Sequence, residues 1–167
     1  MFQIGDKVVY GIHGVCSVTG LEERLVDRKK VTYLVLEPTG QGSSLFLVPA
    51  HNHAAMSKLK PILTPQELET LIQSDAVRMD GWIPDDGKRR HTYREWLNSG
   101  DRTRILCMMR SLYRHREIQL AAGKRCHISD ENYLRDAEKL MAGEFGLVLG
   151  MNAEQAVHYV RNHLQAD

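Results

Sequence analysis

LKPILTPQELETLI, residues 59–72, marks the point at which the sequence changes from one kind of secondary structure to another. Thr64 is followed by Pro65 and, three residues after Thr64, by Glu67, which is a capping box with proline at the first helical position. The apolar residues that follow share one helical face: Leu68, Leu71 and Ile72. We therefore expect a helix to begin here, and a domain boundary near Lys60-Pro61.

The segment before this boundary, residues 1–60, carries the short apolar runs typical of β-strands. The runs that we interpret as strands are 7–10, 14–20, 31–36, 44–48 and 56–59. Turn residues separate them, at 11–14, 27–30 and 38–42. Short strands at this spacing predict a small antiparallel β-barrel, and so few residues predict an interior filled by side chains.

The segment after the boundary, residues 61–167, has the spacing of helices. Beyond the helix that Thr64 opens, we expect helices over 89–97, from Asp101 to about 121, from Ser129 to Gly150, and from Asn152 onward. The fold class is therefore α+β as two domains. A small antiparallel β-barrel is expected over 1–60, and an all-α domain of about five helices over 61–167.

The composition is that of a globular protein, with 43% hydrophobic and 26% charged residues among 167. The N-terminus shows no basic start followed by a long apolar run, so we expect no targeting segment. The longest apolar runs are far below the roughly 20 residues that a membrane-spanning helix needs. Three cysteines without metal-type spacing favour a reduced, cytoplasmic protein.

No constellation of catalytic residues is apparent. The sequence contains no phosphate-binding loop of the Gly-x-x-x-x-Gly-Lys-Ser/Thr type and no Gly-x-Ser-x-Gly elbow. His51 and His53 could point the same way, but two ligands are too few for a zinc site. We expect neither an enzyme nor a bound metal or cofactor.

The formal net charge of +1 hides a strongly basic band. Residues 88–125 carry eleven Lys or Arg against three acidic residues, a net charge of +8, and nine of the eleven cations are arginine. Arginine binds phosphate oxygens in a bidentate manner. A basic band of this kind is an electrostatic footprint for nucleic acid. From charge alone, a solvated helix face with local ion pairs is an equal alternative.

The opening FQIGDKVVYGIHGV, residues 2–15, resembles the start of the CarD/CdnL family of bacterial transcription regulators. A similar module occurs in the transcription-repair coupling factor. The likeness continues at 33–36 and at Val48-Pro49, and in the second half at 97–101 and 144–150. It therefore covers nearly the whole chain.

The resemblance implies a Tudor-like barrel followed by a helical domain. It further implies a protein that binds the β subunit of RNA polymerase through the barrel; we expect this protein to be a monomer. The helical domain would bind promoter DNA without sequence specificity and stabilise the open promoter complex. A tryptophan would act there as a wedge in the minor groove, where inserting an apolar side chain costs a few kcal/mol of unstacking.

The resemblance also implies polymerase-binding residues in the barrel. Arg24 matches a family arginine that contacts the polymerase, whereas Leu47 stands where the family has another arginine. Barrel edges can also recruit a partner by strand addition. Leu25 and Val26, which precede the turn at Asp27, are expected to belong to the same surface.

Two tryptophans compete for the role of the wedge. In the family the tryptophan comes directly before a basic pair, but here residues 83–87 separate Trp82 from the basic run. Trp96 lies on a helical stripe with Tyr93, which indicates a core residue. We predict Trp82 as the wedge, with a partly buried anchor of the loop as the alternative. The predicted DNA contacts are Trp82, Lys88, Arg89, Arg90, Arg94, Arg110 and Arg114.

A different class of protein would have the same architecture. It would be an adaptor whose barrel binds one protein and whose helical domain binds another protein rather than DNA. Salt-dependent retention on DNA separates this alternative from the transcription regulator.

Overall fold

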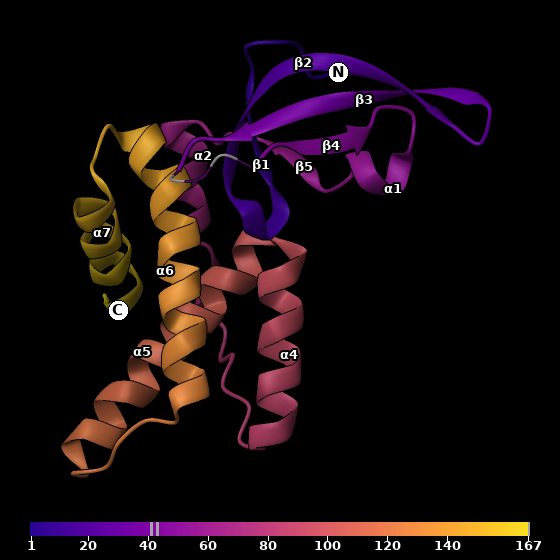
Figure 1. Ribbon diagram of the computed structural model, residues 1–167. Helices are drawn as coiled ribbons and strands as arrows, with labels where there is room; N and C mark the ends of the chain where they lie inside the picture. The colour runs from indigo at the N-terminus through magenta and orange to yellow at the C-terminus, as the bar shows by residue number, and fades with distance from the viewer. Residues whose placement is uncertain (41, 43, 167) are drawn as a thin grey trace. The chain divides into compact units, whose positions relative to one another are not determined.

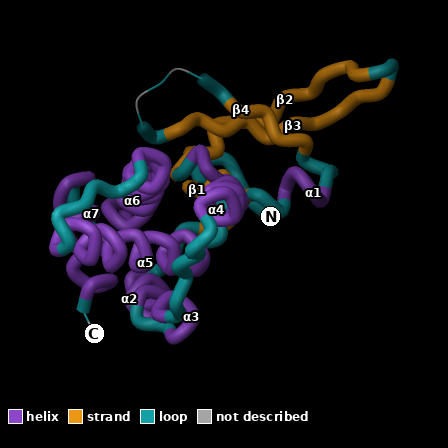
Figure 2. The backbone as a smooth tube through the Cα atoms, turned by 90° about the horizontal axis from the view of Figure 1, so that it is seen from below, coloured by secondary structure: helices purple, strands orange, loops and turns teal. Residues whose placement is uncertain are grey.

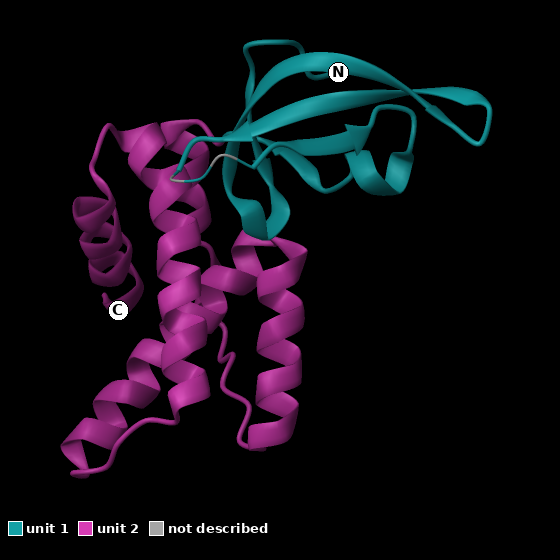
Figure 3. Cartoon of the chain, viewed as in Figure 1, with its two compact units in different colours: residues 1–62 teal, residues 63–167 magenta. Residues whose placement is uncertain are grey.

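The computed structural model describes residues 1–40, 42 and 44–166. The chain forms two compact units, Met1–Ile62 (unit 1) and Leu63–Asp167 (unit 2), shown in different colours in Figure 3. The division falls two residues after the predicted boundary at residue 60. An antiparallel sheet in unit 1 and helices in unit 2 confirm the predicted α+β class.

Unit 1 is a five-stranded antiparallel sheet in the order β4-β3-β2-β1-β5. Its strands are β1 (Lys7–Tyr10), β2 (Val15–Val26), β3 (Lys29–Pro38), β4 (Phe46–Pro49) and β5 (Leu59–Pro61). A 3-10 turn, η1 (Gly11–His13), follows β1, and a single helical turn, α1 (His53–Met56), precedes β5. The strand predicted over 56–59 is wrong in its position, because Asn52 caps a helical turn and β5 begins only at Leu59. No pairing among the described residues joins β4 to β5, so the ladder is open at both edges.

The longest feature of unit 1 is the β2–β3 hairpin, whose two strands are labelled in Figures 1 and 2. Its turn is the pair Asp27-Arg28, and both residues have positive φ, 48° and 65°. Positive φ at both central residues characterises the two-residue turns that match the twist of a hairpin. Near its base β2 contains a bulge, where the pairing passes from Val18 to Gly20.

The core of unit 1 lies on one face of this sheet. Leu34, Leu36 and Val48 are buried there, and Val18 pairs with Leu36 on the same face. Side chains alternate between the faces of a strand, so the residues between them point outward. The end of the hairpin extends past both neighbours, because β4 pairs with β3 only over 33–36 and β1 pairs with β2 only over 15–17.

Unit 2 is a helical bundle built around α5 (Arg102–Ala121), whose first half, from Ile105 to Tyr113, is buried throughout. The other helices are α2 (Pro65–Ile72), α3 (Asp75–Arg78), α4 (Asp86–Ser99), α6 (Ile128–Leu149) and α7 (Ala153–Gln165). Figures 1 and 2 show α7 alongside α6. The prediction did not include α3, a single turn too short to have a periodic pattern.

The predicted helix caps are largely present. Thr64 and Glu67 form the expected capping box, Asp101 and Asn152 accept backbone hydrogen bonds at the starts of α5 and α7, and Gly150 ends α6 with φ 66°. Two starts differ from the prediction. Helix α4 begins three residues before Arg89, and α6 begins one residue before Ser129.

Candidate functional site

A tightly packed glycine positions Trp82. The Gly81 N–H donates to Ser111 Oγ (3.0 Å), and the Gly81 carbonyl accepts from the Tyr93 hydroxyl (2.7 Å). A Cβ at residue 81 would lie 2.8 Å from Cys107 Sγ and 2.9 Å from Ser111 Oγ. Only glycine therefore fits here without movement of these two side chains of α5, and the chain enters Trp82 along a fixed path.

Trp82 is half-buried, and other side chains cover both faces of its indole ring. The His115 imidazole, from α5, stacks on it with ring centroids 3.6 Å apart and an interplanar angle of 16°. The guanidinium carbon of Arg89 lies over the same ring, 4.4 Å from its centroid. Two groups at these distances cannot share one face without overlapping, so the indole lies between them. These are the contacts expected if Trp82 is a partly buried anchor of the loop, which is the alternative to the wedge. Only the edge of the indole ring remains accessible.

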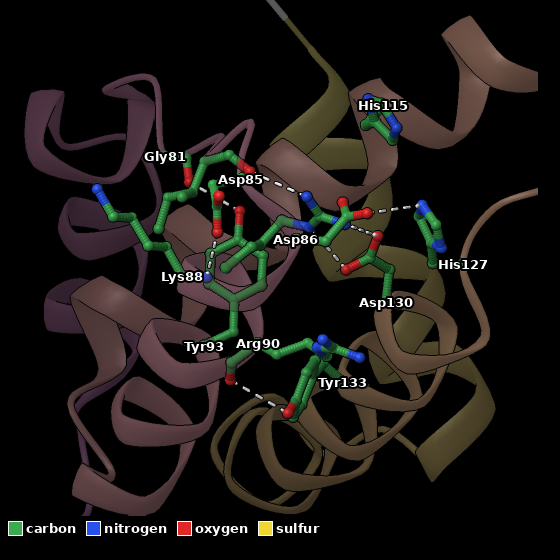
Figure 4. Close-up of polar contacts among 12 residues, drawn as sticks. Gly81, Asp85, Asp86, Lys88, Arg90, Tyr93, His115, His127, Asp130 and Tyr133 are labelled. Atoms are coloured by element: carbon green, nitrogen blue, oxygen red, sulfur yellow. Dashed lines mark hydrogen bonds and ion pairs between the residues drawn. The ribbon is translucent and has the colours of Figure 1, made fainter.

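Arg89, predicted to bind DNA, is instead an interior residue with 1% of its surface exposed. Its Nε and Nη2 donate to the two carboxylate oxygens of Asp130, each at 2.9 Å, and Nη2 also donates to Asp86 (2.8 Å). Its Nη1 donates to the Ile83 carbonyl (3.0 Å). Figure 4 shows this network between α4 and α6. The prediction for Arg89 is therefore wrong, because its hydrogen bonds are made inside the protein.

The electrostatics of this cluster follow from burial and pairing. Burial alone would lower the pKa of Arg89, but the hydrogen bonds that it donates to Asp130 and Asp86 raise the pKa above its ordinary value. The hydrogen bond from Arg89 lowers the pKa of Asp86. Burial, and then the nearby Arg89 cation, lowers the pKa of His115. At neutral pH the indole is therefore held between a neutral imidazole and a charged guanidinium.

The acidic pair between Trp82 and the basic run begins α4. The Asp85 carboxylate accepts a hydrogen bond from the Lys88 N–H (2.8 Å), which makes it the N-cap, and Asp86 pairs with Arg89 (Figure 4). An acidic residue at a helix N-terminus also stabilises the helix dipole. The extra residues thus start the helix earlier and turn Arg89 inward, toward Trp82.

A hollow of about 330 Å³ lies beside Trp82. It is lined by Asp80, Trp82, Arg110, Ser111, Arg114, His115 and Ile118. Arg114 is exposed on α5, one turn from Arg110. Arg110 is only 8% exposed, and its Nη1 donates to the Arg78 carbonyl (3.0 Å). The prediction that Arg110 grips DNA is corrected accordingly: its side chain supports the wall of the hollow.

The remaining predicted contacts lie on α4. Lys88, Arg90 and Arg94 are exposed, and Arg90 and Arg94 are one turn apart. The Arg90 carbonyl accepts a hydrogen bond from the Tyr133 hydroxyl (3.2 Å), as Figure 4 shows. None of the three is among the residues that line the hollow. The structure therefore divides the predicted cations into an exposed group on α4, the single exposed Arg114 beside Trp82, and two interior arginines.

The predicted polymerase-binding residues of unit 1 divide between the two faces of the sheet. Residues paired across strands lie on the same face. Arg24 pairs with Val31, Val26 with Lys29, and Leu47 with Val35, so Arg24, Val26 and Leu47 lie on the face away from the core. Leu25 pairs with Lys30 on the other face, where it is 73% exposed. Arg24 forms an exposed ion pair with Glu22 at 2.7 Å, a kind of contact that adds little stability.

Several residues of the site could not be found from the sequence. Asp130 is 41 positions from Arg89, and His115 lies on α5 whereas Trp82 lies in the loop before α4, so only the fold brings them together. Asp85 had a usable signal, because aspartate is a common N-cap residue. Within the part of the chain that the structure describes, no group of three His, Cys, Asp or Glu residues could hold a metal ion.

Two further findings concern the kind of protein. None of the helices that the structure describes is long and apolar enough to cross a membrane. Residues 2–60 match the family described as the CarD-like/TRCF RID domain, and the match supports placing this chain among CarD-like proteins.

Proposed function

Because residues 2–60 are a CarD-like, RNA polymerase-interacting domain, we propose that this protein stabilises the open promoter complex while bound to the polymerase. Unit 1 binds the polymerase β subunit, and unit 2 binds the promoter DNA beside the melted region without reading its sequence. The protein acts by binding and not as an enzyme. The observation that carries the DNA-binding half of the proposal is the accessible edge of Trp82 beside exposed Arg114.

The chemistry of unit 2 supports a minor-groove contact at a melted junction. An apolar wedge costs a few kcal/mol of base unstacking, which contacts and bending offset. Much of this cost has already been met where the duplex is open. Exposed arginines nearby hold phosphates and position the protein without sequence preference. Such binding is weak and salt-sensitive by itself, so the polymerase supplies the location.

The outward face of the β2–β3–β4 sheet supports the contact with the β subunit. Val31, Tyr33, Val35 and Leu47 are half-buried there, and Arg24 lies at its outer end. A partly apolar surface with an arginine at its margin is typical of protein interfaces. Leu47 offers an apolar contact at the position where the family has a second arginine.

The polymerase contact is tested by capturing the purified β subunit with the full-length protein and its variants. Arg24→Glu reverses a charge on the outward face, whereas Leu25→Glu adds one on the opposite face of the same strand. We expect Arg24→Glu to lose capture about tenfold or more, and Leu25→Glu to retain it. Equal loss in both variants would contradict the assignment of the interface to the outward face.

The DNA contact is tested with purified polymerase on a promoter whose open complex is short-lived. Trp82→Ala is expected to fold and to shorten the lifetime of open complexes relative to the natural protein. Trp96→Phe serves as the matched aromatic control, because Trp96 packs against the core. If Trp82→Ala sustains open complexes as well as the natural protein, Trp82 is not the wedge.

A second candidate is an adaptor whose unit 2 binds a protein. The observation that favours it is the exposed apolar end of α5, where Ile118 is 65% and Leu120 is 64% exposed. The interior positions of Arg89 and Arg110 also reduce the charge that remains for DNA. If the protein is retained on DNA at low salt and released when the salt concentration is raised, the regulator is favoured. If the protein is not retained on DNA at any salt concentration, the adaptor is favoured.

A further inference from the structure

Both flat faces of Trp82 are occupied in the folded protein, which limits how the ring can meet a ligand. His115 stacks on one face at 3.6 Å, and Arg89 lies over the other at 4.4 Å. A base that stacks on an aromatic residue needs a free face. Trp82 in this arrangement can offer only its edge, next to Ile118 and Arg114 in the same hollow.

The guanidinium on one side of the ring is fixed by an unusually complete set of partners. Hydrogen bonds from Nε, Nη1 and Nη2 go to Asp130, Ile83 and Asp86, so three separate parts of unit 2 hold the group. Asp130 is itself buried, at 3% exposure. A cation held over an indole also attracts the ring through its quadrupole. Arg89 is thus a rigid support for Trp82, with little capacity left to bind a phosphate.

We propose that Arg89 and His115 are positioning residues that clamp Trp82 with its edge outward, and that Asp130 fixes the clamp by holding Arg89. The proposal rests on the proposed function, in which Trp82 contacts DNA, and adds how the ring is oriented for that contact. A ring held in this way abuts a base step with its edge and does not capture a flipped base. The cost of ordering the ring is met on folding, so none of it is subtracted from the binding free energy.

The first test examines the clamp in the absence of DNA. In a Trp96→Phe background, Trp82 is the only tryptophan, and its fluorescence reports its own freedom and exposure. His115→Ala removes one face of the clamp, while His115→Phe keeps an aromatic ring there. We expect His115→Ala to lower the fluorescence anisotropy and to raise quenching by acrylamide about twofold, and His115→Phe to restore both. Unchanged fluorescence in His115→Ala would overturn the clamp.

The second test adds DNA with a melted segment, and polymerase, to the same variants. We expect His115→Ala to bind this DNA about fivefold more weakly, as the loss of roughly 1 kcal/mol of ring contact predicts, and His115→Phe to bind normally. A freer ring with undiminished DNA binding would overturn the positioning role. If His115→Ala binds DNA normally, Trp82→Ala distinguishes the two proposals. Normal DNA binding by Trp82→Ala would contradict the proposed DNA contact, whereas weak binding by Trp82→Ala would contradict only the clamp.

A third variant addresses the other face. Asp130→Asn keeps the size of the side chain but removes the charge that holds Arg89, and far-ultraviolet circular dichroism checks that the variant folds. The expected result is the same loss of anisotropy and of DNA binding as in His115→Ala. A folded Asp130→Asn protein with the natural Trp82 signal would show that Asp130 does not act through Arg89. Should this variant unfold, the pair of His115 variants decides the proposal.

Discussion

At the scale of single residues, unit 2 contains a buried ion pair between Arg89 and Asp130. The two side chains are 1% and 4% exposed. Removing one partner of a buried pair leaves an unpaired charge in a medium of low polarity, which is costly. The pair therefore makes Asp130 more important for folding than the exposed carboxylates of α6.

We predict that Asp130→Ala lowers the free energy of unfolding by about 3–5 kcal/mol, because Arg89 loses its main partner. Urea denaturation followed by circular dichroism measures the change. Asp136→Ala, at an exposed position of the same helix, is the control and should change stability by less than about 0.5 kcal/mol. Similar losses in the two variants would mean that Arg89 finds other partners when Asp130 is absent.

The sequence supports predictions about residues only where the information is local. The spacing of Arg89 and Arg90 in a basic run could not distinguish an interior arginine from an exposed one. The difference depends on which face of α4 meets Asp130, and that contact spans 41 positions. Trp82 was identified as a candidate from a motif, but its clamp comes from helices that only the fold brings together.

At the scale of elements, α6 contains two glycines with opposite requirements. A Cβ at Gly146 would lie 2.8 Å from the Met151 carbonyl oxygen, which belongs to the turn leading into α7. A Cβ at Gly143 would meet nothing within 4 Å. The glycine at 146 is therefore required by a close approach of backbone, and the one at 143 is not.

Alanine at these two positions should have opposite effects on thermal stability. Gly143→Ala is expected to raise Tm by stabilising the helix by up to about 1 kcal/mol. Gly146→Ala should lower Tm, because the turn between α6 and α7 must shift to admit the methyl group. Differential scanning calorimetry of both variants checks the pair. A rise in Tm for Gly146→Ala would mean that the turn adapts without cost.

Helix ends were predictable from the sequence where a side chain caps the backbone. Thr64, Asp101 and Asn152 mark helix starts by an interaction within three residues, so they were found. The start of α4 was missed because residues 83–87 were interpreted as a segment that separates Trp82 from the helix. The later start of β5 depends on pairing with β1, a contact of long sequence separation.

At the scale of the whole molecule, the basic band of residues 88–125 is less exposed than its charge suggests. Its net charge is +8, but Arg89 and Arg110 are buried and make their hydrogen bonds inside unit 2. The exposed cations that we propose for DNA binding are Lys88, Arg90, Arg94 and Arg114. The salt dependence of DNA binding counts such contacts, because each neutralised phosphate releases counterions.

We predict that Arg90→Ala, Arg94→Ala and Arg114→Ala each reduce the slope of log affinity against log salt by about 0.9, the value for one phosphate of B-DNA. Titration of a labelled duplex at several salt concentrations measures the slope. Arg135→Ala, an exposed arginine of α6 outside the band, is the control and should leave it unchanged. An equal reduction with Arg135→Ala would indicate binding by diffuse charge.

The bulge in β2 has a consequence for how this surface can change by mutation. Beyond Val18 the strand holds one extra residue, Thr19, so Arg24 and Val26 point outward and Leu25 points to the other side. Deletion of that single residue would remove the bulge and keep the pairs from Gly20 with Val35 to Val26 with Lys29, so these side chains would keep their orientation. Side chains alternate with a period of two, so a slip of β2 by one residue against β3 would instead turn every one of them to the opposite face. A change of register here exchanges the entire face, whereas a substitution alters only one contact.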